Sequence, residues 1–169
     1  MRASLVALLL PLLAHAQAAQ PLTIAGHVVG VHDGDTLTLR IVGEPQRRIR
    51  LVDIDAPEMG QPFGRASKGS LSDLCYGKRA AVIPTATDRY GRTVGRVHCD
   101  GWEADASTVQ LERGMAWAYR RYLTRPELLG IEGAARGARH GLWSALDAVP
   151  PWVWRPRAGR PASSPQQPP

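Results

Sequence analysis

The segment Arg50-Leu51-Val52-Asp53-Ile54-Asp55-Ala56-Pro57-Glu58 places one arginine and three carboxylates within nine residues. Residues 47–54 mix β-branched and charged side chains, a composition that favours a half-buried strand. Pro57 lacks an N–H and biases Ala56 away from helix, so this strand should end there. Charges crowded at a strand end are typical of a functional site, although an exposed edge strand with surface ion pairs would have the same composition.

A second acidic group, Asp33-Gly34-Asp35-Thr36, precedes a stretch that alternates apolar and polar residues from Thr36 to Val42. Alternation with period two predicts a strand with one buried face, and Asp-Gly predicts a turn before it. Antiparallel pairing of this strand with residues 47–54 would make Asp35 and Asp55 neighbours. In a regular strand Arg50 and Asp55 would point to opposite faces, so the strand must bulge or end before Asp55.

The periodicity along the chain predicts an α+β fold that is mainly β. Five strands are expected, at residues 22–31, 36–42, 47–54, 79–86 and 93–99, and three helices at residues 65–74, 105–113 and 124–139. The last helix should open with a capping box, Thr124-Arg125-Pro126-Glu127. Five short strands in a meander-like order, with a helix inserted after the third, indicate a small closed barrel capped by about three helices.

The first residues are typical of a secretory signal peptide. Arg2 supplies a positive start, residues 3–14 are apolar, and small-residue cleavage patterns end at Ala16 and Ala18. We therefore expect residues 1–18 to be removed and the rest to be exported, to the periplasm or the medium, and soluble.

The remaining chain divides into one domain and a tail. Residues 19–155 are long enough for one domain, whereas residues 156–169 are rich in Pro, Ser, Gln and Arg and are expected to be disordered. Trp152 and Trp154, just before this tail, are candidates to cover an apolar patch on the domain.

The charge of the chain favours a polyanionic partner. The formal net charge is +6, and 19 of the 21 basic residues are arginine. The planar guanidinium pairs bidentately with phosphate, so an arginine-rich basic protein is typical of nucleic-acid partners. Genome base composition can also produce a high content of Arg, Ala, Gly and Pro, so the charge alone does not decide the partner.

The sequence contains two cysteines, Cys75 and Cys99. In an oxidising exported compartment such a pair commonly forms a disulfide, which we expect here, the alternative being two buried free thiols. The spacing of the cysteines and histidines does not match that of a zinc site.

Three motifs together resemble the staphylococcal-nuclease-like, or thermonuclease, family: Asp33-Gly-Asp-Thr36, Arg50-Leu-Val-Asp-x-Asp-x-Pro-Glu58 and Asp88-Arg-Tyr-Gly-Arg92. The resemblance extends over residues 24–143. It implies an OB-fold barrel and calcium-dependent hydrolysis of DNA and RNA that leaves 3′-phosphate ends. We also expect the protein to be a monomer and to prefer single-stranded substrate.

The resemblance also implies a metal site. Asp35 and Asp55 would ligate Ca²⁺ directly together with the backbone carbonyl of Ala56, and Asp33 would support them without ligating. Hard carboxylate and carbonyl oxygens are the ligands that calcium prefers.

The same resemblance implies catalytic roles. Glu58 would be the general base, and Arg50 and Arg92 would bind the phosphate whose charge grows in the transition state. The residues expected to contact substrate are Tyr90 and either Tyr119 or Tyr122. The segment between Glu58 and the helix, residues 59–64, is shorter and less basic than the corresponding loop typical of the family, which leaves substrate preference open.

Two other functions were compared with the nuclease. A non-catalytic OB-fold module that binds nucleic acid would be expected to lack Glu58, Arg50 or Arg92, and all three are present. A calcium-stabilised exported binding module would explain the acidic residues but not the paired arginines.

Overall fold

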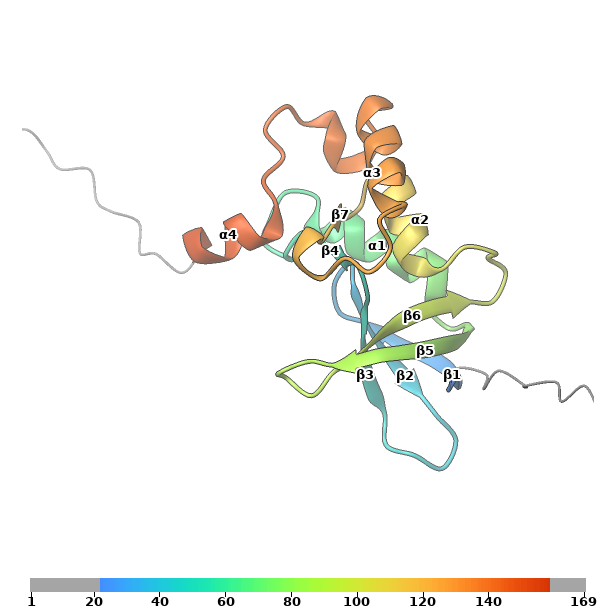
Figure 1. Ribbon diagram of the computed structural model, residues 1–169. Helices are drawn as coiled ribbons and strands as arrows, with labels where there is room; N and C mark the ends of the chain where they lie inside the picture. Colours follow the sequence, from blue (N-terminus) through green and yellow to red (C-terminus); the bar gives the residue numbers. More distant parts are fainter. Residues whose placement is uncertain (1–21, 159–169) are drawn as a thin grey trace, which may run out of the picture.

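A closed five-stranded barrel forms one part of the protein, which we describe for residues 22–158 from a computed structural model (Figure 1). The barrel strands are β1 (Ile24–Val31), β2 (Thr36–Arg40), β3 (Arg47–Leu51), β5 (Arg79–Thr87) and β6 (Thr93–Cys99). Their order is β1-β2-β3-β6-β5, closed by antiparallel pairing of β1 with β5; β3 and β6 are parallel, and the other neighbours antiparallel. The predicted five-stranded, mainly β OB-fold barrel is confirmed.

The barrel core follows from the alternation seen in the sequence. Leu37 and Leu39 of β2 are fully buried, and so is Ile49 of β3, which pairs with Leu37. Val82 and Val97 are paired across β5 and β6 and are also fully buried. Burial of such a side chain contributes about 1.5–3 kcal/mol, so these alternating positions specify which face of each strand points inward.

Helices α1 (Gly64–Cys75), α2 (Ala106–Glu112) and α3 (Leu128–Gly137) gather on one side of the barrel (Figure 1). Helix α2 packs against both α1 and α3. It begins at Asp105, whose carboxylate accepts from the N–H groups of Ser107 and Thr108, and Gly114 follows it with a φ of 62°. The short strands β4 (Ile54–Asp55) and β7 (Trp117–Ala118) form an antiparallel pair, and β7 packs against α3.

The start of α3 differs from the sequence prediction. A helix beginning after Thr124 with a capping box was expected, but the helix begins at Leu128 and no side chain caps it. The Thr124 hydroxyl instead donates to Asp53, far away in the sequence. The capping-box spacing is therefore present without its local hydrogen bonds, because a buried carboxylate competes for the threonine.

A fourth helix, α4 (Pro151–Ala158), lies apart from the other three, beyond the 3-10 turn Gly141–Ser144 (Figure 1). It extends over residues 156–158, which the composition assigned to the tail; residues 159–169 and the expected signal peptide at 1–18 lie outside the described residues. Within residues 22–158, no helix has the length and apolar character needed to cross a membrane.

A disulfide joins Cys75, the last residue of α1, to Cys99, the last residue of β6. Both half-cystines are buried in the hydrophobic core. The bond ties the helix that follows the acidic segment to the barrel wall.

We expect the unreduced protein to resist alkylation at both cysteines and to take up two alkyl groups after reduction under denaturing conditions. Because the bridge closes a loop of 24 residues, replacing both cysteines with serine should lower the unfolding free energy by about 3–4 kcal/mol. Intact mass and denaturant unfolding measure the two effects. Two reactive thiols in native, unreduced protein would contradict the bridge.

Candidate active site

A cleft of about 800 Å³ lies where the two acidic segments meet the β5–β6 turn and the segment before α3. Almost every residue predicted for the site lines it: Asp33, Asp35, Arg50, Ala56, Glu58, Tyr90, Arg92, Tyr119 and Tyr122. Asp55 is fully buried behind this surface and bonds to Arg50 and Arg155, which both line the cleft. The structure therefore brings residues from four separated stretches of the sequence to one place.

The guanidinium of Arg50 joins the two acidic segments. Its Nη1 donates to Asp35 Oδ1 at 2.5 Å, and its Nη2 donates to Asp55 Oδ1 at 3.0 Å and to the Ile54 carbonyl at 3.2 Å. The register of β2 and β3 explains the first contact, because Thr36 pairs with Arg50 and leaves Asp35 at the strand end. Asp35 and Asp55 thus share one guanidinium.

The direction change that places Asp55 there occurs at Asp53. Strand β3 ends at Leu51, Asp53 has a φ of 70°, and β4 starts at Ile54. Few L-residues adopt a positive φ, and Asp and Asn do so more readily than others. The strand therefore ends before Asp55, so strict alternation does not separate Arg50 from Asp55.

Asp53 is held by a network of its own that does not include Arg50. Its carboxylate accepts from the Thr124 N–H and hydroxyl at 2.6 and 2.8 Å and from Arg125 Nε at 2.8 Å. Arg125 also makes a two-bond contact with Asp105. Although burial acts to raise the pKa of Asp105, hydrogen bonds from Arg125 and Thr108 hold it below its ordinary value. The network fixes the kink between β3 and β4.

The acidic turn before β2 is fixed by close packing against α1. A Cβ on Gly34 would lie 1.7 Å from the Ser67 Oγ atom, so only glycine fits. Gln110, fully buried, donates from Nε2 to the carbonyls of Gly34 and Ser67. The Ala56 N–H donates to Asp35 Oδ2 at 2.9 Å, which joins the turn to the second acidic segment.

Burial and mutual repulsion weaken ionisation of the acidic group. Burial, together with the negative charge of Asp35, raises the pKa of Asp33 to about 6. Burial also raises the pKa of Asp55, against the opposing effect of hydrogen bonds from Arg155 and the charge of Arg50. Such a group favours additional positive charge.

Arg92 is positioned by its own turn. Asp88 accepts from the N–H groups of Tyr90 and Arg92 and, at 2.7 Å, from Arg92 Nε. Arg92 Nη1 donates to the Thr36 hydroxyl at 3.4 Å, next to the acidic turn. Tyr90 stays 70% exposed at the cleft and lies under the Arg92 guanidinium.

Glu58 lies on the loop that leads into α1. Its N–H donates to Gln61 Oε1, and its carbonyl accepts from the Gln61 N–H at 2.8 Å. A Cβ on Gly64 would come within 2.0 Å of the Glu58 carbonyl, so the loop returns tightly on itself. The Glu58 side chain remains 41% exposed and can reach solvent in the cleft.

Sequence reasoning gave no site role to Arg155, the last residue of the expected domain, although it lines the cleft. Helix α4 brings this side chain to Asp55 and Glu58. The signal was available, because Pro151 followed by Trp152 and Trp154 is typical of a helix start with aromatic anchors. Trp152 stacks on Tyr119, which lines the cleft together with Tyr122.

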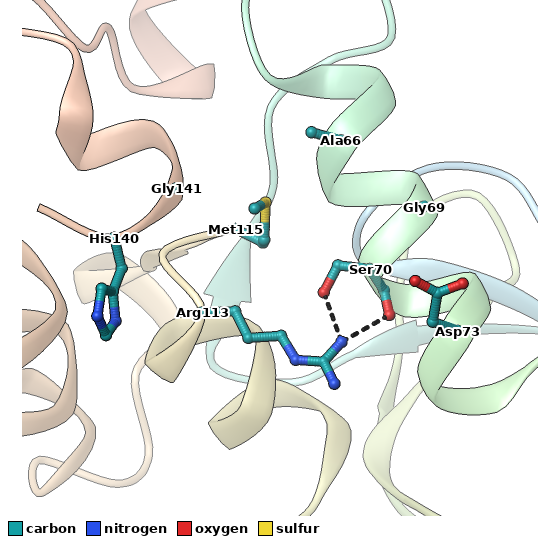
Figure 2. A pocket seen from close by; sticks show the side chains of 8 residues that line it. All are labelled: Ala66, Gly69, Ser70, Asp73, Arg113, Met115, His140 and Gly141. Atoms are coloured by element: carbon teal, nitrogen blue, oxygen red, sulfur yellow. Dashed lines mark hydrogen bonds between the residues drawn. The ribbon is translucent and has the colours of Figure 1, made fainter.

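A second, shallower hollow of about 500 Å³ lies between α1 and the segments following α2 and α3 (Figure 2). The Arg113 guanidinium there donates to the Ser70 carbonyl and hydroxyl, so Figure 2 shows it turned toward α1. Arg113 also stacks on the Trp102 ring. These contacts give Arg113 a packing role and leave the larger cleft as the candidate active site.

The donors available for a metal ion are oxygens. Among residues 22–158, no three His, Cys, Asp or Glu side chains are grouped as a ready metal-binding cluster. The acidic group instead offers the carboxylates of Asp35 and Asp55 and the carbonyl of Ala56, a hard-oxygen set that fits calcium completed by water or substrate oxygens.

The fold and the cleft define an OB-fold barrel with an acidic, arginine-lined site. The family described as "Staphylococcal nuclease homologue" matches residues 48–145. A "Micrococcal nuclease" of Shigella flexneri is 40% identical over 148 residues, 82% of this chain and 84% of that protein. An "Uncharacterized endonuclease" of Escherichia coli O157:H7 is 44% identical over 135 residues, 79% of this chain and 86% of that protein. The chain belongs to the staphylococcal nuclease homologue family, which confirms the resemblance drawn from the three motifs.

We expect Asp53→Asn to destabilise the fold, because asparagine tolerates the positive φ but leaves Arg125 without one of its buried carboxylates. Removal of one partner from a buried ion pair typically costs about 3–5 kcal/mol. The matched control is Glu44→Gln, which breaks the exposed Glu44–Arg47 pair and should change stability by less than about 1 kcal/mol. Denaturant unfolding measures both, and equal effects would show that the Asp53 network does not stabilise the kink.

Proposed function

We propose that this protein is a calcium-dependent endonuclease that hydrolyses phosphodiester bonds in DNA and RNA and leaves 3′-phosphate ends. The observation that carries the proposal is the convergence, in one cleft, of a buried carboxylate pair, the exposed carboxylate of Glu58 and the guanidinium groups of Arg50 and Arg92. Membership of the staphylococcal nuclease homologue family and the printed names of the relatives support the same reaction.

Asp35, Asp55 and the Ala56 carbonyl would hold the calcium ion, with Asp33 fixing Asp35 through the Asp35 N–H. When bound, the ion supplies Lewis-acid stabilisation of charge on a phosphoryl oxygen.

Glu58 is the residue placed to accept a proton from the attacking water, since its carboxylate is partly exposed within the cleft. The water oxygen forms a bond to phosphorus while the bond to the 5′-oxygen breaks; that oxygen takes up a proton from solvent water in the cleft, and Glu58 later returns its proton to solvent. Arg50 and Arg92 stabilise the charge that develops on the phosphoryl oxygens, Arg92 being held by Asp88 and Arg50 by Asp35.

Single-stranded substrate fits the aromatic lining of the cleft. Tyr90 is 70% exposed and Tyr122 is 59% exposed, and both line the cleft beside Tyr119. Stacking of a base on an aromatic ring contributes about 1–3 kcal/mol without sequence preference. The leader-like residues 1–18 support export, and we propose that the exported enzyme acts as a monomer.

Hydrolysis should require calcium. Cleavage of single-stranded DNA, duplex DNA and RNA is compared with added Ca²⁺ and with excess chelator, followed by restoration of Ca²⁺. We expect loss of cleavage in chelator and recovery when Ca²⁺ is restored, because the carboxylate and carbonyl oxygens of the site contact a phosphate through a bound hard cation. The single strand should be cleaved fastest. Undiminished cleavage in chelator would refute the calcium requirement.

Glu58→Gln, Arg50→Lys and Arg92→Lys should each lower kcat by about 10²-fold or more. Glutamine cannot accept the water proton, and lysine cannot rebuild a planar two-bond contact with phosphate. The matched controls are Glu44→Gln and Arg47→Lys, which make the same changes in an exposed ion pair between β2 and β3.

The kcat on single-stranded DNA is measured together with thermal melting of each variant. Near wild-type kcat in all three site variants would place the active site elsewhere. Retained nucleic-acid binding without cleavage by the wild-type protein would favour the non-catalytic binding module.

A further inference from the structure

Resting on the proposed nuclease function, we propose that Arg155 is a third phosphate-binding arginine of this site, delivered by the C-terminal helix α4. Its guanidinium bonds both to Asp55, which we propose holds the calcium ion, and to Glu58, which we propose accepts the proton of the attacking water. Nε donates to Glu58 Oε1 at 2.5 Å, while Nη1 and Nη2 donate to Asp55 at 3.0 and 2.7 Å. A substrate phosphate that meets both Glu58 and the ion must lie beside this guanidinium.

Helix α4 is docked on the site by contacts that do not involve Arg155. The Trp152 ring stacks on Tyr119 with centroids 5.4 Å apart and planes 10° from parallel. Pro151 is buried, and Gln61 of the Glu58 loop donates to the Val149 carbonyl. The arginine is therefore presented by an ordered helix that touches both the loop of Glu58 and the aromatic wall of the cleft.

The acceptor capacity of the carboxylates leaves room for a cation beside Arg155. Each oxygen of an ionised carboxylate accepts about two bonds. Asp55 Oδ1 accepts from Arg50 and Arg155, while its Oδ2 accepts from Arg155 alone in the described part of the chain. Asp35 Oδ1 likewise accepts from Arg50 and the Thr36 hydroxyl, and its Oδ2 from the Ala56 N–H. One acceptor position thus remains on Oδ2 of each aspartate while Arg155 is bound.

The guanidinium also retains donors for substrate. Arginine has five N–H groups, and the described contacts of Arg155 use three of them, one on each nitrogen. One N–H remains on each terminal nitrogen, and the side chain is 43% exposed at the cleft. These two N–H groups lie on opposite edges of the planar guanidinium, so each can donate a single bond, and one of them is available to a phosphate oxygen.

The test compares the wild-type protein with Arg155→Ala, Arg155→Lys and the control Arg40→Ala. Arg40 is an exposed arginine at the end of β2 opposite Thr36, so its removal changes the net charge equally. The first readout is binding of a fluorescent oligothymidylate in excess chelator, followed by anisotropy over a series of salt concentrations. The second is kcat/KM on the same single strand over a calcium titration, with thermal melting of every variant.

Loss of one phosphate contact lowers the slope of log K against log salt by about 0.7 for a single strand, so we expect that change in Arg155→Ala. Arg155→Lys should keep the slope because it keeps the charge. Both variants should lower kcat/KM, by about 10-fold or more for alanine and less for lysine, whereas Arg40→Ala should change neither quantity.

Three results would overturn the proposal. An unchanged salt slope in Arg155→Ala would mean that the side chain meets no phosphate. A higher kcat/KM reached at lower calcium would make Arg155 a competitor of the cation. An equal loss in alanine and lysine variants, with lowered melting temperature and wild-type slope, would make its role structural. Absence of cleavage by the wild-type protein would refute the nuclease function, while the slope would still report on Arg155.

Discussion

The bridge from Arg50 to Asp35 and Asp55 is the interaction on which the arrangement of the site depends. The two acids are separated by 20 positions in the sequence and lie on different segments, and both are buried. Two carboxylates close together in a buried setting repel one another, and the shared guanidinium offsets this repulsion while fixing their spacing. Although burial acts to lower the pKa of Arg50, its two acidic partners raise it, so the bridge stays charged. The β2–β3 pairing holds Arg50 beside Asp35, and the packing of α1 on Gly34 holds the turn that carries Asp35.

The fold was predictable because most of its signals are local. The alternation over Thr36–Val42 and the turn at Asp33–Gly34 depend on neighbouring residues. The strand starts at Thr36 as predicted and ends at Arg40, two residues before the alternation does, and the turn precedes it. The start of α3 was not predictable in this way. Thr124 and Glu127 have the spacing of a capping box, but the threonine bonds to Asp53, a partner that only the tertiary structure brings near. A local motif is reliable when no buried group competes for its side chains.

Within the site, the motif gives the residue types but not the role that each residue takes. Asp53 and Asp55 are two residues apart and chemically identical, yet Asp53 bonds to Thr124 and Arg125 whereas Asp55 bonds to Arg50 and Arg155. The alternation of a strand would place both on one face, and the positive φ at Asp53 separates them. The sequence indicated that the strand had to end or bulge before Asp55, but not which residue would take the strained conformation. That assignment depends on Arg125, which is far from Asp53 in the sequence but bonds to it in the fold.

Arg155 was overlooked for a related reason. The composition of a segment does not show which of its side chains make specific tertiary contacts. The stretch after Pro150 is rich in proline and arginine, and disorder was expected from residue 156 onward. Just before that point Trp152 stacks on the Tyr119 ring and Arg155 donates to Asp55 and Glu58. Each of these contacts requires the barrel, the Glu58 loop and the segment before α3 to be already folded together. The C-terminal helix is therefore ordered by the site on which it docks. The helix docks through Trp152 and Val149, and its Arg155 adds positive charge to the cleft, which is the charge that a buried acidic group with raised pKa values favours.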